Sequence, residues 1–268
     1  MKLAFSTLGC PDWSWGEIFA AARDIGMKGI EVRGVGREMY APAIRPFRPE
    51  KLPETVRQLR QAHMRVCMLT SSACLGIGHP EQYVEESLRY VDLAQQLGTP
   101  YIRVMCSARA APDTDIDTDT IARLYSRICE YGRPRGVTPL LETNGRLADS
   151  REMRRVLDRV TSDNRGVLWD VHHPYRFFGE APAETLMRLG EEIRYLHIKD
   201  SVMVHGQVQY RMMGAGDVPV AEAVRLMEKR GYDGFLSFEW LKRWCPDLEE
   251  PGIVFYQYAD YMKRLLHR

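Results

Sequence analysis

The sequence predicts an α/β fold, a single (β/α)8 TIM barrel that occupies residues 1–268, and three observations carry this prediction. Eight short apolar runs alternate with eight stretches of helical periodicity along the chain. The apolar runs are continuous rather than alternating, which is typical of parallel strands covered on both faces. One strand–helix unit needs roughly thirty residues, so eight units total about 250, close to the 268 residues of the chain.

Each predicted strand is a run of five to seven mostly apolar residues. Such runs suit buried strands and are too short for free-standing helices. The eight strands are expected at 2–6, 29–33, 65–69, 101–105, 138–142, 166–170, 193–199 and 234–240.

The predicted helices lie between these strands and carry sequence signals at their ends. Pro53 and Pro182 stand in opening turns, and Gly26 and Gly98 stand just past two helix ends, where a left-handed residue commonly stops a helix. The eight helices are expected at 15–26, 52–63, 81–98, 121–132, 151–160, 182–190, 220–231 and 253–267.

An open doubly wound sheet is the competing architecture. It seldom has eight repeats, and the chain contains neither a complete G-x-G-x-x-G nor a G-x-x-x-x-G-K-[ST] motif. No linker or low-complexity tract divides the chain, so we expect one domain, with long loops at 42–50 and 108–119.

Composition excludes several classes of partner. The 37 Lys and Arg residues balance 36 Asp and Glu residues, which offers no footprint for nucleic acid or an anionic membrane. The first residues lack the pattern of a signal peptide and no run is long enough to span a bilayer, so we expect a cytoplasmic protein with a small-molecule substrate. Six scattered cysteines without a C-x-x-C pair predict free core thiols.

Candidate functional residues stand at the ends of the last four predicted strands. In a (β/α)8 barrel the active site is built at the carboxyl ends of the strands. Those positions hold Glu142, Asp170, His197 and Glu239. Taken alone, each could be structural: a carboxylate could cap a helix or pair with Arg103, and His197 could be a core histidine. Taken together, the four predict a divalent metal site, because buried charges are costly without a partner.

This ligand set suits Mn2+ or Mg2+, with Co2+, Fe2+ or Zn2+ as alternatives. Carboxylate oxygens favour hard cations and an imidazole admits borderline ones. The ligand set does not choose among these ions.

Four segments resemble the sugar phosphate isomerase/epimerase family of xylose isomerase-like barrels. They are WDVHHP at 169–174, HIKD at 197–200, YRMMGAGDVP at 210–219 and SFEW at 237–240. The resemblance implies a (β/α)8 fold and a site of the Mn2+ type held by Glu142, Asp170, His197 and Glu239, with Glu142 and Glu239 also moving the substrate proton.

The resemblance also suggests substrate-binding residues. It implies a substrate contact for His173, with a hydrogen bond to a loop carbonyl as the alternative, and a substrate-binding role for Arg211. We expect His172 to point elsewhere, since successive residues of an extended segment alternate sides.

Further candidates surround the same strand ends. Lys199 could reach a substrate oxygen or form a structural ion pair, and Asp200 is expected to fix its neighbours. Glu31 is expected near the substrate, with an ion pair to an arginine as the alternative. Tryptophans on both sides of the barrel closure could line the pocket; they are Trp13, Trp15, Trp240 and Trp244.

The segment GAGDVP at 214–219 resembles a family loop that leads into the seventh helix. We expect Asp217 to be the N-cap of that helix. A phosphate cradle is conceivable there, but a tight turn built by Gly214 and Gly216 is the simpler interpretation.

The expected function is a metal-dependent sugar or polyol-ketone isomerase or epimerase. A glutamate would abstract the proton next to a carbonyl, by way of an enediolate. The alternatives are an inosose dehydratase-like lyase, an enzyme like the catalytic subunit of C-glycoside deglycosidases, an endonuclease IV-like repair enzyme and a sugar-binding barrel without catalysis. The endonuclease IV-like enzyme fits less well because the chain has only seven histidines. The sugar-binding barrel fits less well because the full set of four candidate metal ligands is present. A homo-oligomer is possible.

Overall fold

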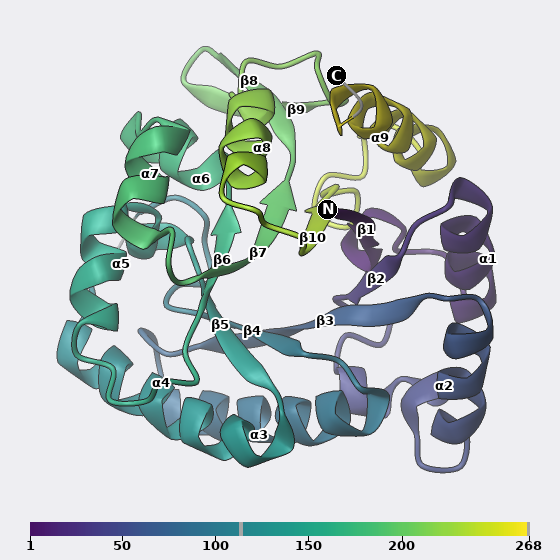
Figure 1. Ribbon diagram of the computed structural model, residues 1–268, viewed down its shortest axis with the longest axis horizontal. Helices are drawn as coiled ribbons and strands as arrows, with labels where there is room; N and C mark the ends of the chain where they lie inside the picture. The colour runs from purple at the N-terminus through teal and green to yellow at the C-terminus, as the bar shows by residue number, and fades with distance from the viewer. Residues whose placement is uncertain (113–114, 267–268) are drawn as a thin grey trace. The chain divides into compact units, whose positions relative to one another are not determined.

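A computed structural model of the chain describes residues 1–112 and 115–266, and it confirms the predicted (β/α)8 barrel. Eight parallel strands close in the order β1-β10-β7-β6-β5-β4-β3-β2 (Figure 1). All eight overlap predicted strands. They are β1 (Lys2–Ser6), β2 (Gly29–Val32), β3 (Arg65–Cys74), β4 (Tyr101–Met105), β5 (Thr138–Glu142), β6 (Val167–Asp170), β7 (Ile193–Ile198) and β10 (Phe235–Phe238). Of these, β3 runs five residues past the predicted end at residue 69.

The eight predicted helices are also present, with ends that shift by a few residues. They are α1 (Trp15–Ile25), α2 (Leu52–Gln61), α3 (Pro80–Leu97), α4 (Thr118–Gly132), α5 (Ser150–Leu157), α7 (Pro182–Leu189), α8 (Val220–Lys229) and α9 (Pro251–Leu266). The predicted helix 253–267 includes residue 267, which lies outside the described residues, as do 113 and 114 of the predicted loop 108–119.

Local sequence explains where α1 begins and ends. The Ser14 side chain accepts the Glu17 amide while the Glu17 carboxylate accepts the Ser14 amide, which forms a capping box. Gly26 stops the helix in a left-handed conformation at φ 83° that a side chain would disfavour.

By contacts the chain divides into two compact units, Met1–Cys67 with His197–Arg268 and Met68–Leu196. The first unit is built around β10, β1 and β2, where β1 pairs in parallel with both neighbours and Ala4 lies opposite Ser237 and Gly29. The Phe5 ring stacks on Phe255 of α9 with centroids 4.0 Å apart. These contacts bury the apolar face of α9 against β1.

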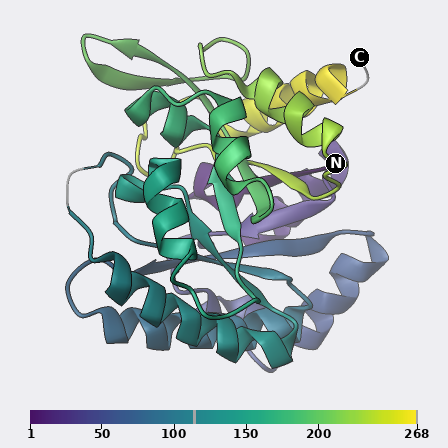
Figure 2. The same cartoon turned by 60° about the vertical axis from the view of Figure 1, so that its left-hand side comes forward.

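The first unit also contains a hairpin that the sequence analysis missed. β8 (Asp200–Val204) and β9 (Gln207–Arg211) pair antiparallel and extend as a two-stranded ribbon, green in Figure 2. His205 and Gly206 connect them with φ angles of 49° and 77°, the positive values that a two-residue hairpin turn requires. The alternating Gln207–Arg211 segment next to a His-Gly pair was the available signal.

The second unit contains β4, β5 and β6, with α3 and α4 side by side along one edge (Figure 1). A helix that the sequence did not predict, α6 (His172–Phe178), follows β6 directly. It is only seven residues long, too short to show helical periodicity.

The Tyr125 hydroxyl links α4 to two strands of the second unit. It lies 2.7 Å from the Pro139 carbonyl oxygen of β5 and 2.9 Å from that of Gly166, and it accepts the Gly166 amide at 3.1 Å. Tyr125 is fully buried, so this hydroxyl satisfies backbone groups that water cannot reach. It therefore helps to place the strands that end in Glu142 and Asp170.

The cysteines fit the prediction of free core thiols. Within the described residues all six are free, and every one except Cys245 is buried. Burial raises the pKa of the Cys106 and Cys129 thiols to about 12. None of the helices in the described part of the chain combines the length and the apolar character needed to cross a membrane.

We predict that one thiol of the native protein reacts readily with a thiol reagent at pH 8. Reactivity follows access and thiolate content, and burial suppresses both at the other five positions. Quantifying the released chromophore should give about one equivalent for the folded chain. The variant Cys245→Ser should lose this equivalent, whereas rapid labelling of Cys245→Ser would contradict the packing described above.

We predict that Tyr125→Phe lowers the free energy of unfolding by about 1–3 kcal/mol, because it leaves buried backbone groups unsatisfied. Urea denaturation followed by circular dichroism measures the change. The matched control is Tyr256→Phe, since Tyr256 is 54% exposed and its variant should stay within about 0.5 kcal/mol of the wild type. Equal stabilities of the two variants would show that the Tyr125 hydroxyl does not hold the strands.

Candidate metal centre and active site

The four candidate metal ligands lie at the carboxyl ends of strands, as the sequence predicts. In the second unit Glu142 ends β5 and Asp170 ends β6. In the first unit His197 stands near the end of β7, and Glu239 follows β10. All four side chains are buried, at 5% exposure or less.

In the first unit His197 lies between two carboxylates. Its Nε2 atom is 3.0 Å from Oε2 of Glu31, and its Nδ1 atom is 3.5 Å from Oε1 of Glu239. Burial raises the pKa of the Glu31 carboxyl, but the charge of His197 and its hydrogen bond outweigh this effect and hold the pKa below its ordinary value. The position of His197 beside Glu31 thus favours the ionised form of that carboxyl.

Lys199 supplies a positive charge to the same cluster. Its side chain is fully buried, and its Nζ atom donates to Oε2 of Glu239 at 2.5 Å. Of the two roles considered for Lys199, the structure shows the ion pair. An ammonium buried this deeply needs a carboxylate partner, so the pair keeps Glu239 in its charged form.

Glu142 has its own cation in the second unit. Arg103 on β4 approaches Oε2 of Glu142 at 3.3 Å and donates to the Ser71 carbonyl oxygen at 3.0 Å. The Ser71 hydroxyl returns a hydrogen bond to the Arg103 carbonyl oxygen at 2.6 Å. The guanidinium is thus fixed on β3 and held against the carboxylate.

Thr143 organises the end of β6. Its hydroxyl accepts the Asp170 amide at 2.9 Å, and its carbonyl oxygen lies 3.0 Å from Nδ1 of His173. A carbonyl oxygen can only accept, so Nδ1 of His173 carries a proton. The neutral ring then keeps its lone pair on Nε2. The hydrogen bond to a loop carbonyl that was considered for His173 is therefore present. A contact between His173 and substrate stays a prediction.

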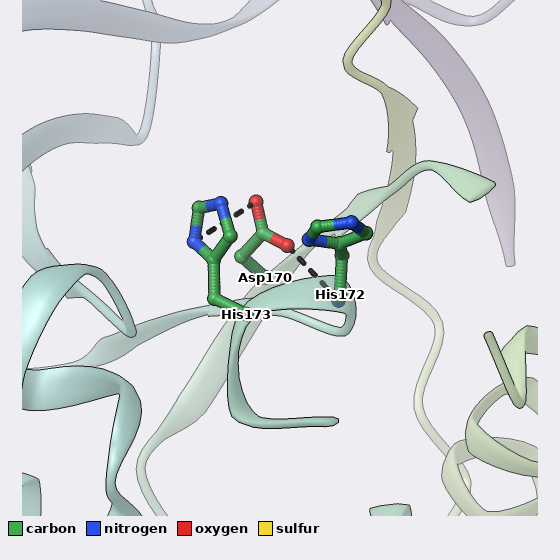
Figure 3. Close-up of side chains that lie close together, drawn as sticks. All are labelled: Asp170, His172 and His173. Atoms are coloured by element: carbon green, nitrogen blue, oxygen red, sulfur yellow. Dashed lines mark hydrogen bonds and ion pairs between the residues drawn. The ribbon is translucent and has the colours of Figure 1, made fainter. Parts of the chain in front are cut away.

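The expected orientation of His172 is wrong. Figure 3 shows the His172 and His173 rings on either side of the Asp170 carboxylate. Their ligand atoms and that of Asp170 lie within 4.8 Å of one another. The expectation assumed an extended chain, but α6 begins at His172, and successive helical residues differ by about 100° rather than 180°. Pro174 in the first turn was a usable helix signal.

The loop 214–218 is organised by Asp200 rather than by Asp217. The Asp200 carboxylate accepts the amides of Gly214, Gly216 and Val218 at 2.9, 3.0 and 3.2 Å. A Cβ on Gly216 would lie 2.1 Å from Oδ1 of Asp200, so the loop needs glycine there. The amides that a phosphate cradle would use are occupied by this internal carboxylate. Asp200 thus fixes its neighbours, as expected.

The predicted N-cap of α8 is also corrected. Pro219 occupies the N-cap position and makes no side-chain hydrogen bond there. Asp217 lies two residues earlier, where its amide donates to the Ser201 carbonyl oxygen at 3.0 Å. Because the loop turns tightly around Asp200, the N-cap of α8 falls at Pro219, two residues later than the sequence pattern suggested.

The remaining predicted substrate residues lie in the first unit. Arg211 on β9 donates to Oε1 of Gln209 at 2.7 Å. The Trp15 ring packs edge-on against Phe47, with centroids 5.1 Å apart. Trp240 is fully buried and its Nε1 donates to the Glu249 carbonyl oxygen at 3.0 Å. Substrate contacts for these three, and for Glu31 and Lys199, stay predictions.

Comparison with known proteins agrees with this fold. Residues 19–258 match the family described as xylose isomerase-like TIM barrel, and the chain belongs to that family. The resemblance read from the sequence is confirmed. Fructoselysine 3-epimerase of Shigella flexneri is 22% identical over 281 residues, which cover 99% of this chain and 98% of that protein.

Solved structures share the same barrel. The probable 3-DHS dehydratase AsbF of Bacillus anthracis superposes with a TM-score of 0.80 at 18% identity, over 98% of this chain and 99% of that one. L-ribulose 3-epimerase gives 0.79 at 16% identity, over 99% and 94%. The IOLI protein, solved with a bound zinc atom, gives 0.76 at 15% identity, over 99% and 96%.

We predict that Thr143→Val lowers the free energy of unfolding by about 1–3 kcal/mol, since the buried Asp170 amide loses its acceptor. Valine keeps the shape of threonine, so packing changes little. Thr143→Ser keeps the hydroxyl and is the matched variant, and it should retain more of the stability. Thermal or urea unfolding distinguishes the two, and a valine variant as stable as the serine variant would rule out this role for the hydroxyl.

Proposed function

We propose that this chain is a divalent-metal-dependent sugar epimerase or isomerase. Its metal would be held by Glu142, Asp170, His197 and Glu239. The observation that carries the proposal is that two glutamates at strand ends, Glu142 and Glu239, each have a buried cation of their own. The similarity to a sugar 3-epimerase over nearly the whole chain supports the same class of reaction.

The chemistry of the donor set fits a divalent cation. Three carboxylates and one imidazole each offer a ligand atom, and all four are buried at the strand ends where barrel enzymes place their active sites. Their strands β5, β6, β7 and β10 are successive in the closed barrel. Mn2+ is our first choice because oxygen donors dominate, and the zinc atom of the IOLI structure supports a divalent metal more generally.

A bound divalent cation would supply the Lewis acid that stabilises negative charge on substrate oxygens. The protein's own residues would then handle the proton. Arg103 and Lys199 form ion pairs with Glu142 and Glu239, the two carboxylates that would act as general base and acid. One glutamate would take the proton from the carbon next to the carbonyl, and the other would return a proton to the opposite face.

In this proposal His173 binds a hydroxyl of the substrate. Its Nδ1 proton is fixed on the Thr143 carbonyl oxygen, so Nε2 is left to exchange a hydrogen bond with a substrate hydroxyl. Arg211 and the tryptophans Trp15 and Trp240 are proposed to complete the sugar site. A cytoplasmic location and a homo-oligomer stay predictions from the sequence.

A dehydratase is the second candidate, favoured by the superposition on AsbF. It begins with the same proton abstraction, but a hydroxyl on the next carbon then leaves as water. Product analysis separates the two reactions, because epimerisation conserves mass and dehydration loses one water.

We predict that the Mn2+-loaded protein exchanges one carbon-bound hydrogen with solvent deuterium in at least one compound of a panel. The panel contains fructoselysine, L-ribulose and 3-DHS, and NMR and mass spectrometry report exchange, inversion or loss of water. Glu142→Gln and Glu239→Gln should each lower interconversion by about 10²–10⁴-fold, the usual contribution of a general acid or base.

Metal content and a control variant make the result interpretable. Glu180 is a buried glutamate that accepts the Ser150 hydroxyl at 2.8 Å and belongs to none of the clusters above, so Glu180→Gln should keep turnover. Mass spectrometry of the metal in each variant separates a lost ligand from a lost base. No exchange with any compound, or unchanged metal and turnover in both glutamine variants, would contradict the proposal.

A further inference from the structure

The placement of His197 between two carboxylates sets which of its nitrogens can bind a metal. A neutral imidazole has one N–H and one lone pair, and the neighbours decide which nitrogen keeps the proton. The contact from Nε2 to Glu31 is 3.0 Å, an ordinary hydrogen-bond length. The contact from Nδ1 to Glu239 is 3.5 Å, at the outer limit. The distances therefore put the proton on Nε2.

Glu239 does not need the imidazole proton, because Lys199 already donates to its other oxygen at 2.5 Å. Glu31 faces the ring in a region without solvent, with both side chains 0% exposed. A fully buried carboxylate gains strongly from a charge-assisted hydrogen bond. Both neighbours thus favour the same tautomer, with the Nδ1 lone pair directed toward Glu239.

The strand that carries Glu31 holds it rigidly. β2 pairs with β1 in parallel register, with Ser6 opposite Glu31 and Ala4 opposite Gly29. A Cβ on Gly29 would lie 2.6 Å from the Cys67 sulfur and 2.7 Å from the Phe235 ring, so β2 packs tightly at its start. Groups that orient a ligand act best from such rigid elements.

We propose that Glu31 is a positioning residue, which holds His197 in the Nε2–H tautomer and so presents Nδ1 to the divalent metal. This inference rests on the proposed metal-dependent function and deepens it. It replaces the substrate contact that the sequence suggested for Glu31, and the two roles have different consequences. A positioning residue acts on metal affinity and on the imidazole, whereas a substrate contact acts on KM.

The first measurement is the Mn2+ affinity of the metal-free protein, by isothermal titration calorimetry. Glu31→Gln keeps the size of the side chain and removes its charge. We expect the Kd for Mn2+ to rise about 10–100-fold, the usual effect of losing a carboxylate that orients a histidine ligand. The matched control Glu180→Gln also neutralises a buried carboxylate, and it should leave the Kd within about twofold.

The second measurement needs neither metal nor turnover. Nitrogen-15 NMR of the metal-free protein at alkaline pH, where the ring carries one proton, identifies the protonated nitrogen of His197. The wild type should show the Nε2–H form. Glu31→Gln should populate the Nδ1–H form, because the Glu239 carboxylate then faces that nitrogen without competition from a second charge.

The outcomes separate this inference from the proposed function. An unchanged Kd and an unchanged tautomer in Glu31→Gln, with a raised KM, would overturn it in favour of substrate binding. If the wild type binds no Mn2+ but the tautomer still switches, the metal function fails and the tautomer assignment stands. Should Glu31→Gln fail to fold, Glu31→Asp keeps the charge but shortens the reach, and a wild-type Kd and tautomer in that variant would likewise overturn the inference.

Discussion

Burial of ionised side chains at the strand ends is the constraint on which the site depends. A carboxylate removed from water is costly unless a cation and hydrogen bonds replace its hydration. The chain meets this requirement separately for each glutamate. Arg103 pairs with Glu142 and Lys199 pairs with Glu239, while Nε2 of His197 lies at hydrogen-bond distance, 3.0 Å, from Glu31. Any variant that removes one member of a pair therefore leaves a buried charge, and stability and chemistry change together.

The pairing of neighbouring strands determines which charged side chains lie next to each other. In the second unit β4 and β5 pair with Arg103 opposite Leu140, which places the arginine two residues before Glu142 on the neighbouring strand. The Thr143 hydroxyl then extends the β5–β6 ladder by one position, since it accepts the Asp170 amide where β5 has already ended. Parallel pairing, together with the Thr143 side chain just after β5, thus fixes the carboxyl ends of these strands.

The sequence predicts strands well because continuous apolar runs of five residues leave few alternatives. It also locates Glu142, Asp170, His197 and Glu239, since strand ends are counted directly from those runs. It does not reveal that Glu31 contacts His197, because 166 residues separate them and no local pattern encodes the pairing. The same holds for Asp200, whose carboxylate organises a loop up to 18 residues further on. The predicted orientation of His172 was wrong for another reason, because a seven-residue helix is too short to show a periodic pattern in the sequence.

The two histidines of the strand ends are oriented by different acceptors, and this difference matches their proposed roles. The nearest acceptor to Nδ1 of His173 is a neutral carbonyl oxygen at 3.0 Å, and the Asp170 carboxylate lies further away at 3.5 Å. Nε2 of His197 faces a carboxylate, which makes the opposite nitrogen a stronger electron donor. A stronger donor suits a metal ligand, whereas an uncharged ring suits hydrogen-bond exchange with a sugar hydroxyl. The opposite tautomers proposed for the two rings follow from which nitrogen each acceptor faces, and the chemistry of the nearest acceptor matches the role proposed for each ring.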